Sequence, residues 1–174
     1  MTHRGGRVRP LLGSLLFFVI APGAVAGWVP YLLVRWRFRP PLLGVPAGRV
    51  VGGVLAAAGA AMLVECFARF AIEGRGTPAP IAPTKGLVVS GLYRYVRNPM
   101  YVAVLTIIMG QALLFGSVRL LGYAGIVWLL VHTFVVLYEE PTLRRRFGNS
   151  YDIYRADVRR WWPRLGPWRG PSRD

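Results

Sequence analysis

Two adjacent uncharged segments, residues 100–118 and 120–138, constrain this chain more than any other feature of its sequence. Each has 19 residues without Asp, Glu, Lys or Arg, and as a helix each would reach about 29 Å, close to the roughly 30 Å of a bilayer's hydrocarbon core. Only Arg119 separates them, so the helices must form a tight antiparallel hairpin, with Gly116 and Ser117 at the corner. The charged share of 17% also favours a membrane protein, because soluble domains carry roughly a quarter charged residues.

Two earlier segments have the same character. Residues 11–34 carry no charge over 24 positions, and Pro22-Gly23 leaves open whether they form one span or a broken, re-entrant pair. Residues 50–72 are rich in Gly and Ala, which predicts a span buried among other helices. Within it, Glu65 and Arg69 stand four residues apart, either as a salt bridge on one helix face or as a polar lining for a cavity.

Basic residues cluster between and after the apolar segments. The 22 Lys and Arg against 7 Asp and Glu give a net charge of +15. Anionic lipid headgroups attract arginines placed in this way, and we expect no nucleic-acid partner because no RNA- or DNA-binding motif is present. After Arg144, apolar residues recur at spacings of three and four at Tyr151, Tyr154 and Val158, which predicts a basic amphipathic helix on the membrane surface.

The sequence therefore predicts an all-α integral membrane protein, 1–174, with about four transmembrane helices, the first single or broken into two, and a C-terminal amphipathic surface helix. Cys66 is the single cysteine, so no internal disulfide is expected, and with two His the chain lacks the ligands for a zinc site. The expected parts are N-terminal spans at 1–72, a connector at 73–99, a helical hairpin at 100–138, a C-terminal segment at 139–164 and a tail at 165–174, which looks frayed from residue 167.

The arginine-rich C-terminus predicts the orientation. Short flanking segments rich in arginine stay in the cytoplasm, so the C-terminus is expected on the cytoplasmic side of the inner (plasma) membrane. Counting back through two spans places the connector at 73–99 in the cytoplasm, and two more spans place the N-terminus there. One conflict arises if residues 11–34 are a single span, because four arginines then lie outside. These are Arg35, Arg37, Arg39 and Arg49.

The hairpin brings two polar motifs to one membrane face. Residues 94–99 precede the first of its helices and Glu139-Glu140 follow the second, so the two motifs are expected to be close neighbours. Asn98 is a good N-cap and Pro99 fits the first helical turn, and this helix start together with Arg97 favours an anion. The two carboxylates favour a cation or hydroxyl groups. The alternative is that Arg97 and a glutamate only pair to hold the helix ends together.

These residues carry a resemblance to a known family. Residues 91–101 read Gly-Leu-Tyr-Arg-Tyr-Val-Arg-Asn-Pro-Met-Tyr, and residues 139–154 read Glu-Glu-x-x-Leu-x-x-x-Phe-Gly-x-x-Tyr-x-x-Tyr. Both motifs, at this spacing, resemble the signature of the isoprenylcysteine carboxyl methyltransferase and phospholipid methyltransferase group of integral membrane enzymes. The likeness covers residues 77–164, and one departure is Asn98, where many members have His.

The resemblance implies a methyltransferase that uses S-adenosylmethionine and releases S-adenosylhomocysteine. It implies that Arg97 meets the methionine carboxylate, that Glu139 or Glu140 meets the ammonium and ribose hydroxyls, and that an aromatic ring stacks on adenine, from Phe147, Tyr151 or Tyr154. The residues it assigns to cofactor binding are Gly91, Tyr93, Asn98, Pro99, Tyr101, Glu139, Glu140, Leu143, Phe147, Tyr151 and Tyr154. The residues expected to matter most for catalysis are Arg97, Glu140 and Arg94.

The expected acceptor is lipophilic, because a site at the membrane face selects substrates that partition into lipid. A carboxylate or thiol on an apolar tail needs least from the protein, since it is nucleophilic when ionised and a rim of arginines favours its anionic form. A phospholipid amine is the alternative acceptor. A non-enzymatic membrane scaffold or transporter subunit, in which the same charges only seal helix ends, is the alternative from a different class.

Overall fold

The computed structural model describes residues 20–73, 87 and 89–170, and these residues form helices and connecting segments without a β-strand. The all-α expectation is therefore confirmed for this part of the chain. The helical elements, in order, are the π-helical η1 (Ala24–Trp28), α2 (Val29–Val34), the 3₁₀ turn η2 (Leu42–Gly44), α3 (Ala47–Glu73), the 3₁₀ turn η3 (Gly91–Arg94), α4 (Pro99–Phe115), α5 (Val118–Phe134), the π-helical η4 (Val135–Glu139), α6 (Glu140–Phe147) and α7 (Asn149–Asp157).

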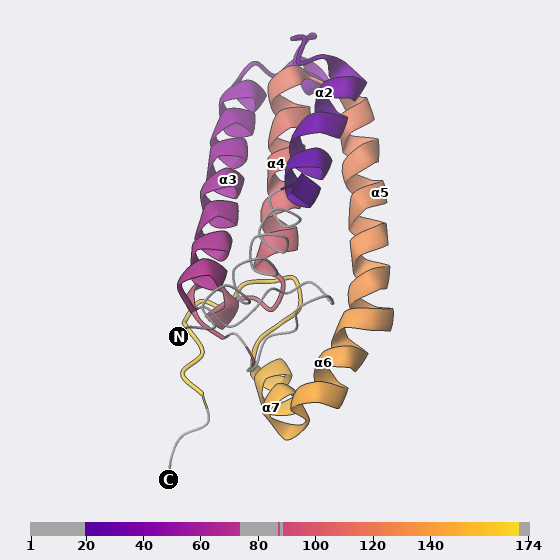
Figure 1. Cartoon of the computed structure of the whole chain (residues 1–174). Helices are drawn as coiled ribbons and strands as arrows, with labels where there is room; N and C mark the ends of the chain where they lie inside the picture. Colours follow the sequence, from indigo (N-terminus) through magenta and orange to yellow (C-terminus); the bar gives the residue numbers. More distant parts are fainter. Residues whose placement is uncertain (1–19, 74–86, 88, 171–174) are drawn as a thin grey trace, which may run out of the picture.

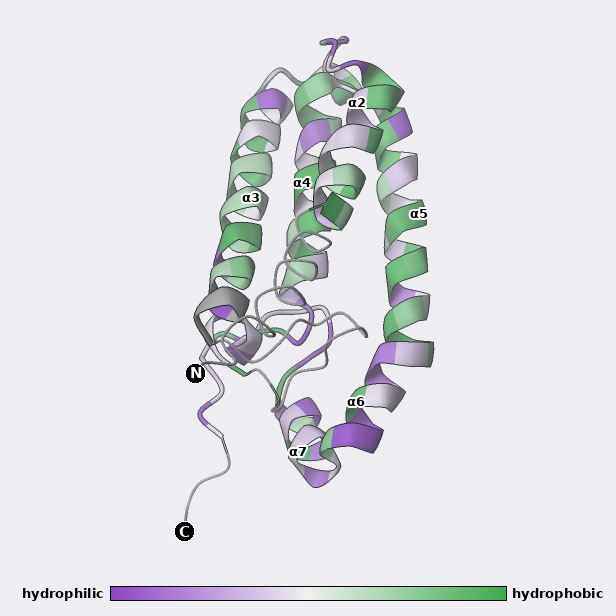
Figure 2. Cartoon of the chain, viewed as in Figure 1, coloured by the Kyte–Doolittle hydropathy of each residue, from purple (hydrophilic) through white to green (hydrophobic). Residues whose placement is uncertain are grey.

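Three long helices, α3, α4 and α5, run side by side, and α2 packs against α4 and α5 over part of their length (Figure 1). One end of the bundle holds the α2–α3 connection and the α4–α5 turn, and is called the loop end. The other holds η3, α6, α7 and the last turns of α3, and is called the tail end. The helix shafts are mainly hydrophobic, whereas α6 and α7 are mainly hydrophilic (Figure 2).

Two helices are long and apolar enough to cross a membrane, Ala47–Arg69 and Val118–Phe147. The other two apolar helices, Ile20–Val34 and Pro99–Phe115, are shorter. The predicted hairpin is present, but its first helix ends three residues before the expected boundary at Val118. There Gly116 adopts a left-handed conformation with φ of 65° and ends the helix.

Among the described residues, helix α3 is not surrounded by other helices, contrary to the expectation from its small residues. It packs along α4 through one glycine-lined face, and its other face is exposed. A Cβ atom built on Gly52 would lie 2.5 Å from the Leu114 nitrogen, and one on Gly110 would lie 2.5 Å from the Ala56 nitrogen. The small residues therefore bring two backbones into contact, as in other membrane helix pairs, and do not mark a central helix.

The first apolar helix continues without a break from residue 20 to residue 34, through the π-helical turn η1. The Val29 N–H donates to the Ala24 carbonyl, five residues back, and Pro30 has no N–H to continue the series. Two carbonyls are thereby freed, and the neighbouring helices supply their donors. Gln111 Nε2 donates to the Ala26 oxygen at 2.6 Å, and Tyr123 donates to the Val25 oxygen at 2.9 Å.

The C-terminal segment differs most from the expected surface helix. Helix α5 runs on through η4 and α6 to Phe147, and the chain then turns at Gly148 into α7. The side chains of Tyr151, Tyr154 and Val158 are buried, and they pack with Trp168 and other apolar residues of the tail end. The apolar face of α7 therefore faces the protein and not the lipid, and hydrogen bonds hold the segment as far as Trp168.

Candidate functional site

The first motif, residues 91–101, is held by backbone hydrogen bonds to the C-terminal segment. The bonded residues follow one another in opposite order along the two segments, as in an antiparallel pair, although neither segment is a β-strand. The bonds are Arg97 N to Arg159 O (3.0 Å), Arg164 N to Tyr95 O (2.9 Å) and Trp168 N to Arg94 O (2.9 Å). The C-terminal segment therefore positions the motif, a role that the sequence pattern did not reveal.

The expected meeting of the two motifs is present. Arg97 Nη1 lies 3.0 Å from Glu140 Oε1, and each side chain is only 12% exposed. Arg160 completes the arrangement with two further bonds to the same carboxylate, at 2.6 Å from Nε and 2.8 Å from Nη2. Glu140 is thus clamped by two arginines, and the hydrogen bond to Glu140 raises the pKa of Arg160 above its usual value.

Sequence reasoning missed Arg160 because nothing in its surroundings distinguishes it from the other arginines after residue 144. The side chain of Asn98 helps to position Arg160. The Asn98 side chain forms no cap hydrogen bond at the start of α4, and its Nδ2 donates instead to the Arg160 carbonyl oxygen at 3.2 Å. Asn98 therefore occupies the N-cap position of α4 as expected, but its side chain does not cap the helix, and Pro99 occupies the first turn as expected.

Glu139 faces a different partner from Glu140. Tyr101 on α4 donates its hydroxyl to Glu139 Oε2 at 3.1 Å. No arginine or lysine among the described residues lies within ion-pair distance of Glu139. Of the two adjacent carboxylates, Glu139 is therefore the one whose charge is not balanced by an ion pair with a described residue.

Gly91 begins the first motif where the chain meets α3. It adopts φ of 54°, and a Cβ on it would overlap Glu65 Oε1. Glu65 accepts a hydrogen bond from Arg69 at 2.8 Å, so the predicted pair within the second span is formed, and it contacts the motif. Gly91 is therefore required both for its backbone conformation and for this close approach.

Tyrosines of both motifs join the tail end together. Tyr154 donates its hydroxyl to the Tyr93 carbonyl oxygen at 2.6 Å, and Tyr151 accepts a hydrogen bond from Arg97 at 3.2 Å. Burial raises the pKa of both Tyr93 and Tyr154, so these hydroxyls stay protonated. Leu143 and Phe147 pack against Tyr151 and Tyr154 in the same cluster.

Three of the predicted site residues, Tyr151, Tyr154 and Arg94, are engaged in contacts within the protein. The rings of Tyr151 and Tyr154 are only 2% and 3% exposed, so neither offers a free face for an adenine. Arg94 points to the C-terminal segment, where its Nε donates to the Trp168 carbonyl oxygen at 2.6 Å. Arg94 therefore holds this segment in place, and its expected part in catalysis stays a prediction.

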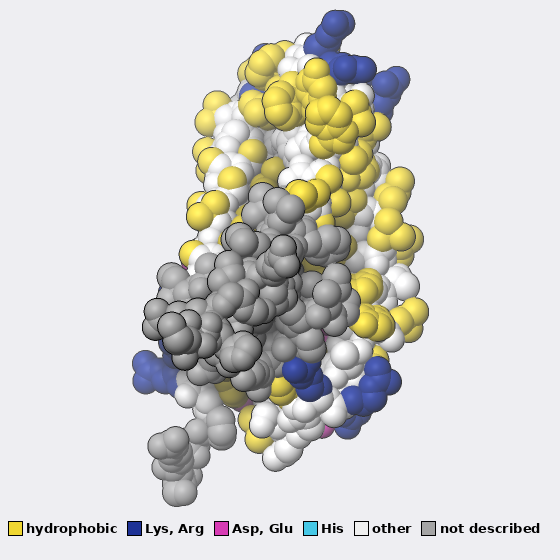
Figure 3. Space-filling view, in the orientation of Figure 1, with side chains coloured by type: hydrophobic (Ala, Val, Ile, Leu, Met, Phe, Trp, Pro, Cys, Tyr) yellow, Lys and Arg dark blue, Asp and Glu magenta, His cyan; other side chains and the backbone are white. Residues whose placement is uncertain are grey.

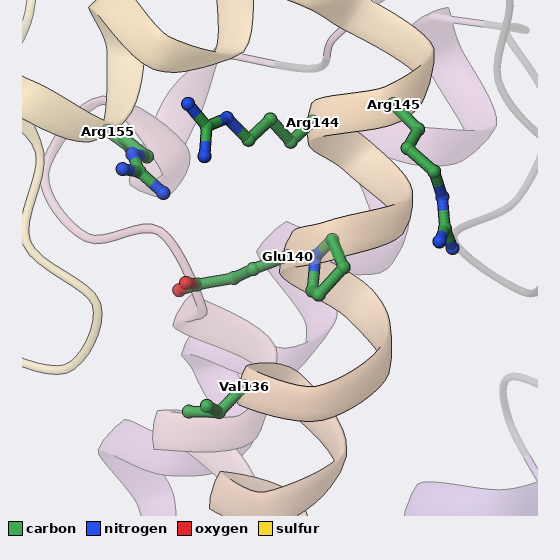
Figure 4. A pocket seen from close by; sticks show the side chains of 6 residues that line it. Val136, Glu140, Arg144, Arg145 and Arg155 are labelled. Atoms are coloured by element: carbon green, nitrogen blue, oxygen red, sulfur yellow. The ribbon is translucent and has the colours of Figure 1, made fainter.

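An open pocket of about 520 Å³ lies beside Glu140, a size within the range of small-molecule sites. It is lined by Val136, Glu140, Pro141, Arg144, Arg145 and Arg155. Glu140, Arg144 and Arg155 point toward the same space, whereas Arg145 points to the other side of the helix (Figure 4). Arg144 and Arg155 each also lie within 3.4 Å of Asp152. The pocket thus combines one clamped carboxylate with exposed guanidinium groups.

A family model described as "Phospholipid methyltransferase" matches residues 47–150. This segment includes α3, α4, α5 and α6, the whole first motif, and the second motif as far as residue 150. The chain belongs to the phospholipid methyltransferase family. No curated protein and no solved structure matches the chain.

Membership in this family of integral membrane methyltransferases confirms the resemblance seen in the sequence. The matched segment ends before Tyr151, Tyr154 and Arg160. The clamp on Glu140 therefore combines Arg97 from inside the family segment with Arg160 from outside it.

Proposed function

We propose that the chain transfers a methyl group from S-adenosylmethionine to a lipophilic acceptor, a carboxylate or thiol on an apolar tail, at the tail end of the bundle. The observation that carries the proposal is the meeting of the two family motifs beside a pocket that holds groups of both charges. S-adenosylhomocysteine is the product. Membership in a methyltransferase family supports the reaction class.

The residues of the tail end fit this cofactor. Arg97 Nε is buried and has no hydrogen-bond partner among the described residues, and Arg144 and Arg155 face the pocket, so donors for a carboxylate are present. Glu139, which forms no ion pair with a described arginine, suits the cofactor's ammonium or sulfonium. Glu140 contributes by fixing Arg97 and Arg160. We assign the adenine to no tyrosine of α7, because both rings are buried.

When bound, S-adenosylmethionine supplies an electrophilic methyl group, whose in-line transfer needs little covalent help from the protein. The chain's own residues then have three tasks, which are to bind, to orient and to exclude water. Glu139 and Tyr101 hold one side of the site, and the arginines around Glu140 hold the other. None of these residues needs to take or give a proton when the acceptor is already an anion.

The charge around the pocket favours an anionic acceptor. Four arginines, Arg97, Arg144, Arg155 and Arg160, surround two carboxylates, those of Glu140 and Asp152. This positive excess stabilises the ionised form of a carboxylic acid or a thiol. The second candidate acceptor is a phospholipid amine, which the description of the family favours, with Glu139 as the group that would meet its positive charge.

We place the tail end, with the C-terminus, on the cytoplasmic side of the inner membrane. The arginines of the C-terminal segment support this orientation. A reporter fused after Asp174 is expected to respond as cytoplasmic, and so is one inserted near Ala82. Opposite locations for these two sites would mean that the two motifs do not share a membrane face.

The acceptor is tested by incubating the chain in native membranes with S-adenosylmethionine that carries a radiolabelled methyl group. Label in an extractable neutral ester or thioether supports the first acceptor class, and label in an aminophospholipid supports the second. The control is a Glu139→Gln variant, which removes the charge but keeps an oxygen that accepts the Tyr101 hydrogen bond. Label that appears only in water-soluble products would exclude a lipophilic acceptor. A purified chain that does not bind S-adenosylmethionine would favour the scaffold or transporter alternative.

A further inference from the structure

The loop end carries five arginines and no acidic residue. They are Arg35, Arg37, Arg39, Arg49 and Arg119, and the nearest Asp or Glu in the sequence is Glu65. Every ion pair formed by the described residues uses side chains of the tail end. The arginines of the loop end therefore have no counter-charge within the described part of the protein.

The loop that carries these arginines has a defined structure. Arg39 N donates to the Phe115 carbonyl oxygen at 3.1 Å, and Arg49 Nη2 donates to the Arg39 carbonyl oxygen at 2.7 Å. The rings of Phe38 and Phe115 lie 5.2 Å apart, and a Cβ on Gly116 would overlap the Pro40 oxygen. The loop is thus docked on the α4–α5 turn, with Arg49 as a structural member.

The beginning of the loop adopts an uncommon backbone conformation. Arg35 and Trp36 have φ of 51° and 49°, which is unfavourable for residues with a Cβ. Trp36 Nε1 donates to Gln111 Oε1 at 3.3 Å, and the Arg35 guanidinium lies 5.5 Å from the Tyr31 ring centre. Contacts to the helices therefore hold a strained turn that directs neighbouring arginines to the surface.

Large apolar side chains surround the exposed arginines. Trp28, Trp36 and Phe38 are exposed, and Leu43 is 99% exposed. Figure 3 shows the same arrangement, with arginine side chains above a band of hydrophobic ones at the loop end. Tryptophan and arginine together are typical of the headgroup layer of a membrane, where the ring meets the acyl boundary and the guanidinium meets phosphate.

We propose that the loop end is a binding surface for acidic phospholipids of the adjacent leaflet. Arg35, Arg37, Arg39 and Arg119 supply exposed guanidinium groups, which form paired hydrogen bonds with phosphate oxygens. The exposed rings beside them contact the first carbons of the acyl chains. The surface lies at the opposite end of the bundle from the methyl-transfer site, so it does not depend on the proposed function (Figure 1).

The surface is tested by thermal unfolding of the purified chain in detergent micelles that contain increasing phosphatidylglycerol or phosphatidylcholine. We expect phosphatidylglycerol to raise the unfolding temperature more than phosphatidylcholine does. The triple variant R35Q/R37Q/R39Q should need far more phosphatidylglycerol for half of the effect, by about fivefold for each arginine at the membrane surface. The matched control R146Q/R159Q/R169Q removes the same charge from exposed positions of the tail end and should respond like the wild type.

Two further samples keep the test decisive. The variant R35K/R37K/R39K keeps the charge and should retain most of the response, and the single variant R37Q replaces the triple variant if that fails to fold. A full response in the glutamine variants, or an equal loss in the tail-end control, would overturn the proposal. Inorganic phosphate at millimolar concentration should give no such shift, and a shift of equal size would indicate a site for soluble anions instead of lipids.

Discussion

The contact between α3 and α4 makes a sharp prediction about two neighbouring glycines. Gly52 faces α4, whereas a Cβ on Gly53 would meet nothing within 4 Å. The substitutions Gly52→Ala and Gly53→Ala therefore add the same methyl group to adjacent residues of one helix. Both gain the same helix propensity, roughly 0.5–1 kcal/mol in favour of Ala. The difference between the two variants isolates the packing between the helices.

The size of the effect follows from the geometry at Gly52. The added Cβ would lie 2.5 Å from the Leu114 nitrogen and 2.6 Å from the Gly110 oxygen, where ordinary contacts begin at 3.4 Å. The shortfall of 0.9 Å (3.4 minus 2.5) falls on backbone atoms, which cannot rotate away, so the helices must separate. Overpacking of this kind costs about 1–3 kcal/mol.

Thermal unfolding in detergent, followed by tryptophan fluorescence, measures this difference. We expect Gly52→Ala to unfold roughly 2–12 °C below Gly53→Ala, since 1 kcal/mol corresponds to about 2–4 °C for a chain of this size. Gly53→Ala itself should be as stable as the wild type or slightly more stable. Equal unfolding temperatures for the two variants would refute the close packing of α3 on α4.

Three further predictions concern buried polar contacts. Gln111→Leu leaves the Ala26 oxygen without its donor and should lower the free energy of unfolding by about 1–3 kcal/mol in a denaturant titration. Gln111→Glu also lacks the donor and should not restore this stability. Arg160→Ala removes two of the three arginine hydrogen bonds to Glu140 and should lower the unfolding temperature, whereas the exposed Arg169→Ala should not. Glu139→Gln should weaken S-adenosylmethionine binding by roughly 10- to 100-fold in calorimetry, as expected for loss of a charged partner. The unfolding temperature should change little, and an unchanged affinity would mean that Glu139 is not part of the site.

The sequence predicted those features that depend on short-range rules. The uncharged lengths at 100–118 and 120–138 predicted the hairpin, and the hairpin alone predicted that residues 94–99 would lie near Glu139-Glu140. Arg97 does meet one of these glutamates, Glu140, at 3.0 Å. The i, i+4 spacing of Glu65 and Arg69 likewise predicted a contact that is formed. In each case one helix or one turn determines the geometry, so no knowledge of the rest of the fold was needed.

The features that the sequence did not predict depend on packing between distant segments. Periodicity identified the apolar face of α7, but the same pattern fits lipid or protein, and Trp168 and its neighbours decide for protein. Small residues in α3 predicted close approach, but not how many helices approach. Arg160 is one of nine arginines after residue 143, and only the fold selects it as the partner of Glu140.

The adjacency of Glu139 and Glu140 has a structural consequence for the site. Neighbouring residues on a helix point about 100° apart, so the two carboxylates face different elements. Glu139 meets Tyr101 on α4, and Glu140 meets Arg97 and Arg160 beside the C-terminal segment. The Glu140 N–H donates five residues back to the Val135 carbonyl, and this π-helical turn sets the direction of both side chains just before Pro141. The pair is thus not a single acidic site, because Glu140 orders two arginines whereas Glu139 meets a tyrosine hydroxyl and forms no ion pair with a described residue.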